Sequence, residues 1–256
     1  MCGRFVSSST PDELAAYFGV DNVAESVLAP APGNGGSKDE EPPAGPRANY
    51  NVAPTQDVFA IVEDDVDDEV QRYLDAFFWG LVPSWAKDVK IGSRMINARA
   101  ETLAEKNAYK SSFKKRRCII PADGFYEWKK LDPSKKKSPK QPMFVQRADG
   151  KPLAFAGLWS VWRGPDKDQD PLRSVTIITT RPNETMRPIH DRMPVILGED
   201  DWATWLDRGN DDIDMLGRLL VPAPDDLLTT RTVSTEVNNV GNNGPSLIED
   251  AEPIAL

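Results

Sequence analysis

The sequence predicts an α+β fold, with a curved, mostly antiparallel sheet or barrel-like core and flanking short helices. Apolar runs of strand length outnumber helical patterns, and the two do not alternate regularly, as a doubly wound sheet requires. The chain has 256 residues, of which 39% are hydrophobic, so it can bury a substantial core. Neither a repeat nor a clean boundary divides it, and we expect one domain over residues 1–256.

The first predicted element is a helix that ends near Gly19. Thr10 is a good N-cap, Pro11 suits the first helical position, and the next two residues are acidic. Further along, residues 30–46 contain five prolines, four glycines and no bulky apolar side chain. Such a segment cannot bury enough surface to offset the entropy lost on ordering. We expect it to be a flexible surface loop inserted in the domain.

Strands are predicted where short apolar runs are bounded by Gly, Pro or Asp. The predicted strands are residues 58–62, 117–121, 143–146, 153–160, 174–180 and 194–197. Helices are predicted where apolar side chains recur at helical spacing. The remaining predicted helices are residues 100–109, 199–207 and 212–220. A nearly all-acidic turn is expected at residues 63–69.

The charge of the chain is unevenly distributed. A net charge of −9 argues against a general nucleic-acid coat. Residues 111–140, however, hold ten basic and three acidic residues, a local charge of +7 that leaves −16 on the rest. A basic strip with aromatic residues on an acidic body suits selective contact with a polyanion. A solvated, lysine-rich hairpin tip explains the strip equally well.

Several classes of protein are excluded by motifs that the sequence lacks. No apolar run reaches 18 residues and no signal-peptide pattern opens the chain, so we expect a cytoplasmic protein without a membrane partner. The dinucleotide fingerprint and the phosphate loop are absent. Two cysteines and one histidine fall short of a structural zinc site. We therefore expect no metal and no cofactor, and any chemistry must come from side chains and the N-terminus.

Cys2 is the most specific local feature. Because cysteine is small, removal of Met1 would leave Cys2 with an α-amine and a thiol on adjacent carbons. Both groups have ordinary pKa values close enough to neutrality to act as nucleophiles. With an aldehyde, the pair forms an imine and then a thiazolidine ring; alternatively, the thiol attacks an amide with the amine as base. The remaining interpretation is a cysteine that merely lies near the start of translation.

Three other segments carry candidate catalytic or binding groups. Asn97 and Arg99 are two residues apart, on one face of an extended chain. Glu127 stands between two aromatic residues, where desolvation suits a general acid, although a strand-end salt bridge fits equally well. His190 is the only histidine and is followed by an aspartate and an arginine, so its role is either catalytic or structural.

Nine motifs follow one another along nearly the whole chain. They are MCGRF at 1–5, YNVAP at 50–54, FWGLVPSW at 78–85, INARAET at 96–102, RRCIIPADGFYEWKK at 116–130, AGLW at 156–159, TT at 179–180, IHDRMPVIL at 189–197 and VNNVGNNGPSLIE at 237–249. Together they resemble the SRAP family, the SOS response-associated peptidases or abasic-site processing proteins. The loop at 30–46 and the acidic body depart from the family pattern and are interpreted as surface elaborations.

The resemblance implies an SRAP-like fold and a role in the DNA damage response. Such a protein binds single-stranded DNA that carries an abasic site and traps the sugar aldehyde on Cys2 as a thiazolidine. Asn97 would orient the Cys2 amine, Glu127 would act as acid and base, and His190 would assist proton transfer. β-Elimination from the imine would be a lyase side activity. No cofactor is implied, and a monomer suffices.

The resemblance also implies a set of DNA-binding residues. Guanidinium groups suit phosphate oxygens, and those that would bind phosphates are Arg4, Arg99 and Arg192. Aromatic and flat side chains stack on any base, and the wall beside the lesion would consist of Trp79, Pro54 and Asn51. The set is completed by Trp128 and Thr179.

Two other functions remain open from the residues alone. A cysteine peptidase or self-processing amidohydrolase would use Cys2 to attack an amide, with removal of Met1 as its minimal reaction. A non-covalent single-strand binder would be released from DNA by salt and would show no preference for a lesion. Only the abasic-site function predicts a covalent adduct between the protein and a nucleotide, so such an adduct separates it from these two alternatives. When bound to DNA, the cytoplasmic protein would be associated with the nucleoid.

Overall fold

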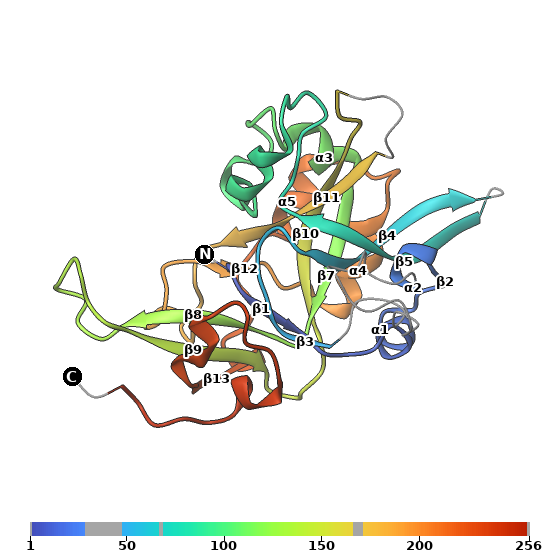
Figure 1. Cartoon of the computed structure of the whole chain (residues 1–256). Coiled ribbons are helices and arrows are strands. Elements are labelled where there is room, and N and C mark those ends of the chain that lie inside the picture. The colour runs from blue at the N-terminus through green and yellow to red at the C-terminus, as the bar shows by residue number, and fades with distance from the viewer. Residues whose placement is uncertain (1, 29–47, 67–68, 166–170, 255–256) are drawn as a thin grey trace.

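The computed structural model describes residues 2–28, 48–66, 69–165 and 171–254. Two curved sheets share a hydrophobic core and are flanked by short helices (Figure 1). This confirms the α+β class and the mostly antiparallel, barrel-like core. The predicted loop at 30–46 lies outside the described residues.

Five strands of the larger sheet close into a barrel. They are β4 (Asp57–Val66), β5 (Glu69–Trp79), β7 (Arg117–Ala122), β10 (Leu153–Trp162) and β11 (Leu172–Thr180). The strands pair antiparallel in the order β11-β10-β7-β4-β5, and β5 then pairs with β11 in parallel to close the ring. Three short strands pair with this barrel: β2 (Asn22–Val23) with β5, and β6 (Asn97–Arg99) and β12 (Met193–Pro194) with β11.

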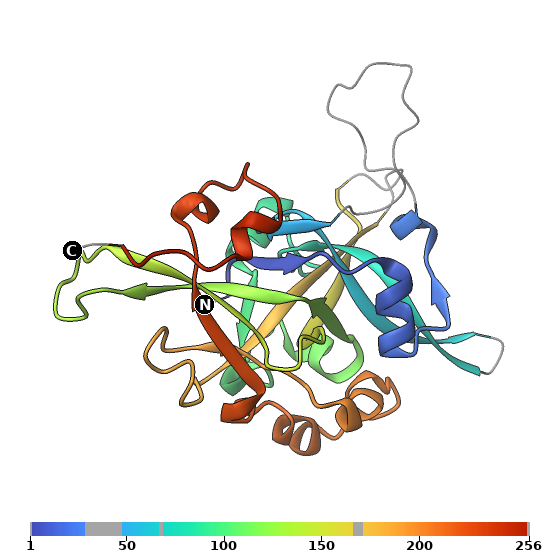
Figure 2. The same ribbon diagram turned by 90° about the horizontal axis from the view of Figure 1, so that it is seen from below.

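The second sheet is antiparallel throughout and carries the N-terminal strand in its interior. Its order is β13-β9-β8-β1-β3. The strands are β1 (Phe5–Ser7), β3 (Asn49–Val52), β8 (Gly124–Lys130), β9 (Lys140–Arg147) and β13 (Leu228–Thr232). β8 and β9 continue beyond the sheet as a hairpin that projects from the body (Figures 1 and 2). Phe5 packs edge-on against Trp79 of the barrel at 5.1 Å, so β1 is anchored over the barrel interior.

Short helices cover the rest of the barrel. The α-helices are α1 (Pro11–Phe18), α2 (Glu25–Leu28), α3 (Lys110–Lys115), α4 (Trp202–Leu206) and α5 (Ile213–Arg218). The 3-10 turns are Val89–Arg94, Ala100–Thr102, Glu199–Asp201, Asp225–Leu227, Thr235–Asn238 and Pro245–Ile248. Trp205 of α4 is buried and donates its indole N–H to the Cys118 carbonyl of β7 at 2.9 Å. None of the helices in the described ranges is long and apolar enough to cross a membrane.

The first predicted helix is confirmed, and its start is a complete capping box. The Thr10 hydroxyl accepts from the Glu13 backbone N–H, and the Glu13 carboxylate accepts from the Thr10 backbone N–H. Gly19 ends the helix with φ +62°, a left-handed conformation that glycine adopts without strain. The apolar runs at 58–62, 117–121, 143–146, 153–160 and 174–180 all lie within strands.

Three predictions of local structure are wrong. Residues 100–109 form no α-helix: only Ala100–Thr102 is helical, as a 3-10 turn, because β6 runs directly into it and no side chain caps its N-terminus. Residues 63–66 and 69, predicted to form a turn, belong to strands β4 and β5, and Glu63 pairs with Arg72 across the ladder and forms an ion pair with it at 2.7 Å. Residues 67–68 lie outside the described residues. The strand predicted at 194–197 is reduced to Met193–Pro194 and an isolated bridge at Ile196.

Candidate active site

Cys2 is held at the mouth of the barrel by Asn97. The thiol-bearing residue is fully buried, and Asn97 Nδ2 donates to its carbonyl oxygen at 2.7 Å. Asn97 is the first residue of β6 and pairs with Ile177 of β11, so the barrel backbone fixes its position. Asn97 Oδ1 is buried and accepts no hydrogen bond within the described part of the chain. The amide therefore presents an open acceptor beside the Cys2 backbone.

A pair of glycines brings Asn97 to this position. The chain leaves β5 at Gly80 (φ +141°) and returns through Gly92, and the two backbones touch. A Cβ on Gly80 would lie 2.6 Å from the Gly92 carbonyl oxygen, and one on Gly92 would lie 2.5 Å from that of Gly80. Any larger residue at either position would collide with the opposite backbone, so both positions require glycine. The close approach directs the following residues onto the barrel edge as β6.

Glu127 lies on β8 and is almost completely buried. β8 pairs with β1, and the Tyr126 backbone N–H donates to the Arg4 carbonyl at 2.9 Å, which brings Glu127 close to the N-terminal segment. The electrostatic consequence is visible at Cys2: burial raises the pKa of its thiol well above the ordinary value, and the negative charge of Glu127 raises it further. At neutral pH the thiol is protonated and needs a base to become a nucleophile.

His190 faces Glu127 from the loop between β11 and β12. Its Nε2 is 4.0 Å from Glu127 Oε2, and its Nδ1 is 2.9 Å from Asp191 Oδ1. The backbone N–H of Arg192 donates to Nδ1 at 3.0 Å, so a neutral ring carries its proton on Nε2, toward Glu127. A protonated ring donates from Nδ1 to Asp191 instead. Because both protonation states have a partner, this histidine is suited to proton transfer.

Arg4 and Trp128 lie next to each other on the second sheet. Arg4 Nη1 donates to Asn51 Oδ1 at 2.7 Å and to the Val237 carbonyl at 2.9 Å, and its guanidinium lies 5.9 Å from the Trp128 ring centre. Trp128 donates its indole N–H to Asn238 at 2.7 Å. Both side chains are partly exposed. The arrangement presents a cation on an aromatic face one or two residues from Cys2 and Glu127.

Three predicted DNA-contact residues are buried and form hydrogen bonds within the chain. Trp79 is 0% exposed and donates its indole N–H to the Ile96 carbonyl at 3.0 Å, so its ring offers no accessible face in this structure. Asn51 is buried, and its amide donates to the backbone of the Asn-rich segment at 237–242. Thr179 is fully buried and bonds the Ala98 carbonyl at 3.3 Å. In each case tertiary packing uses the group that a nucleotide would need.

The remaining predicted contacts lie at or near the surface. Arg99 is exposed, and Pro54 is half-buried beside Thr55, whose φ of +72° is unusual for a β-branched residue. Arg192 forms a two-pronged ion pair with Glu101, at 2.7 and 2.9 Å, and also donates to the Thr179 carbonyl. A phosphate at Arg192 would have to compete with the Glu101 carboxylate.

Trp85 is a candidate contact residue that the sequence interpretation did not include. It lies in the same FWGLVPSW motif as Trp79, but its side chain is 60% exposed. Its loop is tied to the barrel, because Leu81 N–H donates to Met95 and the Trp162 indole donates to the Ala86 carbonyl. A large exposed aromatic on an anchored loop is a stacking surface. The signal was its position after Pro83 and Ser84, which mark a loop and not a strand.

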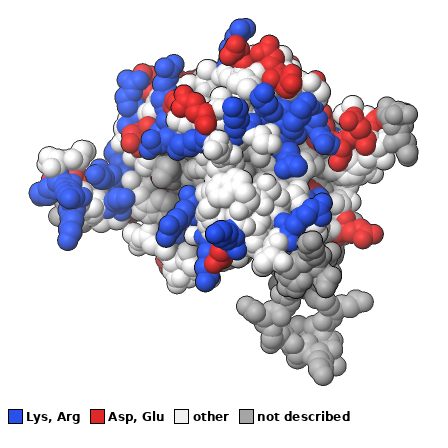
Figure 3. All heavy atoms as spheres, turned by 90° about the horizontal axis from the view of Figure 1, so that it is seen from above, with Lys and Arg blue, Asp and Glu red and all other residues white. Residues whose placement is uncertain are grey.

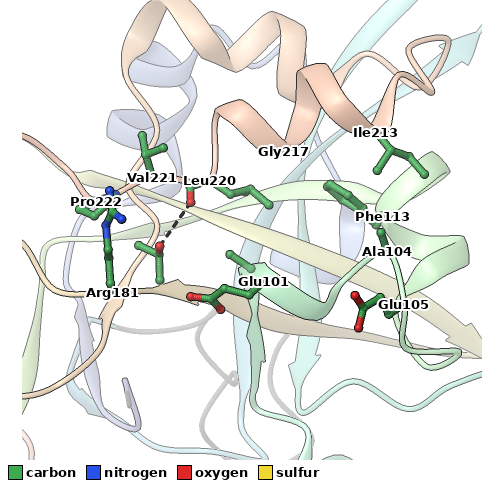
Figure 4. A pocket seen from close by; sticks show the side chains of 12 residues that line it. Glu101, Ala104, Glu105, Phe113, Arg181, Ile213, Gly217, Leu220, Val221 and Pro222 are labelled. Atoms are coloured by element: carbon green, nitrogen blue, oxygen red, sulfur yellow. Dashed lines mark hydrogen bonds between the residues drawn. The ribbon is translucent and has the colours of Figure 1, made fainter.

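A separate cavity of about 390 Å³ has Glu101 in its wall (Figure 4). Its walls are Ala100, Glu101, Ala104, Glu105, Phe113, Thr180, Arg181, Ile213, Gly217, Leu220, Val221 and Pro222. None of the four candidate catalytic residues lines it. Within the described residues, no group of three or more His, Cys, Asp or Glu side chains is placed to hold a metal.

The Cys2 carbonyl is bound by the Asn97 amide, the Cys2 thiol is subject to the charge of Glu127, and Glu127 faces the His190 imidazole. This arrangement defines a protein with a candidate N-terminal nucleophile. Residues 1–240 match the family described as SOS response associated peptidase (SRAP). The chain belongs to the SRAP family.

Named relatives and a solved structure agree with this assignment. The chain is 43% identical to the abasic site processing protein YoqW of Bacillus subtilis, over 97% of this chain and 99% of that protein. It is 32% identical to the abasic site processing protein YedK of Escherichia coli, over 97% and 99% of the two chains. A crystal structure of a Bacteroides thetaiotaomicron protein has the same fold, with a TM-score of 0.78, 24% identity, and coverage of 98% of this chain and 100% of that one.

Proposed function

We propose that this protein processes abasic sites in single-stranded DNA by forming a covalent thiazolidine through Cys2. The observation that carries the proposal is the contact between Asn97 and the Cys2 carbonyl, with the charge of Glu127 acting on the Cys2 thiol and His190 behind it. The names of the SRAP relatives point to the same lesion. DNA repair is the cellular process that this activity would serve.

The reaction begins when removal of Met1 converts the Cys2 nitrogen into an α-amine. Asn97 Oδ1, the open acceptor, would hold one N–H and so direct the nitrogen lone pair toward the aldehyde carbon of the ring-opened sugar. The amine adds to that carbon, and the carbinolamine loses water to form an imine. Glu127 and His190 would supply and remove the protons of these two steps.

Ring closure follows on the same carbon. The Cys2 sulfur adds to the imine carbon, its proton passes to a base, and the imine nitrogen takes up a proton to become the ring amine. Overall, one C–N and one C–S bond form and one water leaves. If closure is slow, the imine makes the neighbouring carbon acidic and permits β-elimination of the 3′ phosphate, which is the lyase side reaction.

The DNA strand would lie across the surface that joins the two sheets. Arg4, Arg99 and Arg192 would bind phosphates, the last after exchange of its Glu101 partner, and Trp128 and Trp85 would stack on bases. Pro54 would border the lesion. These contacts do not depend on base identity, as a lesion sensor requires.

The intact mass of the protein tests this function. A Cys118→Ala variant, in which Cys2 is the only cysteine, is incubated with an abasic single-stranded oligonucleotide and with the intact one. We expect a mass equal to protein plus oligonucleotide minus one water with the abasic strand only, stable to denaturation. Absence of this mass from a folded protein lacking Met1, or peptide turnover without DNA, would reject the proposal.

Replacing Trp85 by alanine is expected to weaken binding of single-stranded DNA by roughly 10- to 100-fold, because stacking on one base contributes about 1–3 kcal/mol. A Trp85→Phe variant should retain most of the affinity, since it keeps an aromatic face. Fluorescence anisotropy with a stable abasic analogue that lacks the aldehyde measures both. Equal affinities of the alanine and phenylalanine variants would exclude stacking at this position.

A further inference from the structure

The hairpin formed by the ends of β8 and β9 is strongly basic. We call residues 129–140 the lysine arm. Its lysines are Lys129, Lys130, Lys135, Lys136, Lys137 and Lys140, and its one acidic residue is Asp132. The arm extends away from the body, and in the space-filling view its tip is a dense group of basic side chains (Figure 3).

The backbone of the arm forms a regular hairpin. The β8–β9 ladder continues without interruption to the pair Lys130 and Lys140. Beyond it, Leu131 N–H donates to the Pro139 carbonyl at 3.0 Å and Asp132 N–H donates to the Ser138 hydroxyl at 2.8 Å. These bonds extend the hairpin beyond the ladder, so the basic side chains project from a hydrogen-bonded backbone.

Lys130 and Lys140 are directly opposite each other across the antiparallel ladder. Like charges at such a position repel and lower the stability of the hairpin. Of the six lysines, Lys135 alone forms an ion pair among the described residues, with Asp132 at 3.1 Å. The arm thus concentrates positive charge that its own fold does not neutralise. An external anion with several charges would relieve this repulsion.

The arm is also joined directly to the candidate active site. Glu127 and Lys130 lie three residues apart on β8, about 10 Å along an extended strand. Trp128 lies between them, beside Arg4. A DNA strand that places its lesion at Cys2 would meet the first lysines of the arm within a few nucleotides.

The alternative partner of the lysine arm is a second copy of the chain. Its β4–β5 hairpin projects from the opposite end of the molecule and carries acidic side chains (Figure 3). Two of these acids are already engaged within the chain. Glu63 pairs with Arg72 at 2.7 Å, and Asp64 pairs with Arg208. The charge that would bind a partner's lysine arm is therefore partly cancelled within the chain, which favours nucleic acid.

We propose that the lysine arm is a second DNA-binding site, which holds the phosphate backbone flanking the lesion beyond the nucleotides at Cys2. This inference rests on the proposed function of that site. Lysine ammonium groups act as point charges without base recognition, so the contact is independent of sequence and strongly dependent on salt. The flank is either single-stranded or duplex, since both offer the same phosphates.

The test compares short and long DNA with an arm variant, Lys130→Gln, Lys136→Gln and Lys137→Gln. The short oligonucleotide covers the lesion alone, and long ones extend it on the 5′ or 3′ side, as a single strand or a duplex. All carry the stable abasic analogue. We expect the variant to lose about tenfold in affinity for at least one long DNA, and the slope of log K against log salt to fall in magnitude by about 2. The extension that responds identifies the flank.

Two controls separate this inference from the function on which it rests. The variant should bind the short oligonucleotide and crosslink a short aldehyde-bearing one like the unchanged protein; failure of both proteins to crosslink rejects the proposed function instead. A control with the same charge change, Lys106→Gln, Lys110→Gln and Lys115→Gln, should keep its affinity for long DNA. Equal loss in both variants, equal loss on short and long DNA, or no loss at all would overturn a role of the arm.

Discussion

Replacing Cys2 by alanine is expected to abolish the denaturation-stable complex with abasic single-stranded DNA. Alanine permits removal of Met1 and keeps the α-amine, so the imine still forms, but no sulfur is present to close the ring. The variant should therefore give an adduct that is seen only after reduction with borohydride. Because the imine persists, β-elimination should increase, and more cleaved strand should appear beside it on a denaturing gel.

The matched control is Cys118→Ala, which removes the other buried cysteine on β7. This variant should crosslink as the unchanged protein does, provided that its thermal unfolding shows that it is folded. A hydrolysis-resistant adduct formed by the Cys2→Ala variant would show that another nucleophile traps the sugar. Loss of crosslinking in the folded Cys118→Ala variant would also contradict the proposal, because the crosslink would then depend on Cys118.

Replacing Glu127 by glutamine should slow crosslinking by roughly 10²- to 10³-fold, because the amide keeps the shape of the side chain but cannot take up or release a proton. Affinity for the stable abasic analogue should be unchanged, since the carboxylate makes no contribution to phosphate binding. The rate is measured by quenched time points on denaturing gels, and the affinity by anisotropy.

The same variant has a second readout that a merely structural role would not give. The negative charge of Glu127 raises the pKa of the Cys2 thiol, so its removal should lower that pKa and increase the thiolate fraction at a given pH. Alkylation of Cys2 should then become faster in the variant at mildly alkaline pH. Unchanged alkylation would contradict an electrostatic effect of Glu127 on the thiol, and thermal unfolding of the variant checks that β8 remains folded.

Much of the local structure follows from the sequence. The first helix is specified within a few residues by Thr10, Pro11 and Glu13, and the structure confirms each bond of its cap. The strands are marked by apolar runs between turn residues, and their number favoured the α+β class. Predictions failed where a partner strand decided the conformation, as at residues 63–66, which belong to the β4–β5 ladder and in which Glu63 pairs with Arg72.

The candidate site divides in the same way. The sequence alone singled out Cys2, Asn97, Glu127 and His190, each from the chemistry of its own segment and all from the family motifs. It contained nothing about which atoms meet. Closure of the barrel and the pairing of β1 with β8 put the Asn97 amide on the Cys2 carbonyl and the Glu127 charge near the thiol.

Tertiary structure also decided which residues are available to DNA. Trp79 and Trp85 occur in one motif, yet Trp79 ends a barrel strand and points into the core, whereas Trp85 follows the turn at Gly80 and is exposed. The net charge of −9 likewise conceals an arm with unneutralised lysines and a hairpin in which Glu63 and Asp64 are paired with arginines. Caps, turns and periodicity are interactions between near neighbours and can be read along the chain. Burial and charge pairing join residues that are distant in sequence, so only the fold determines them.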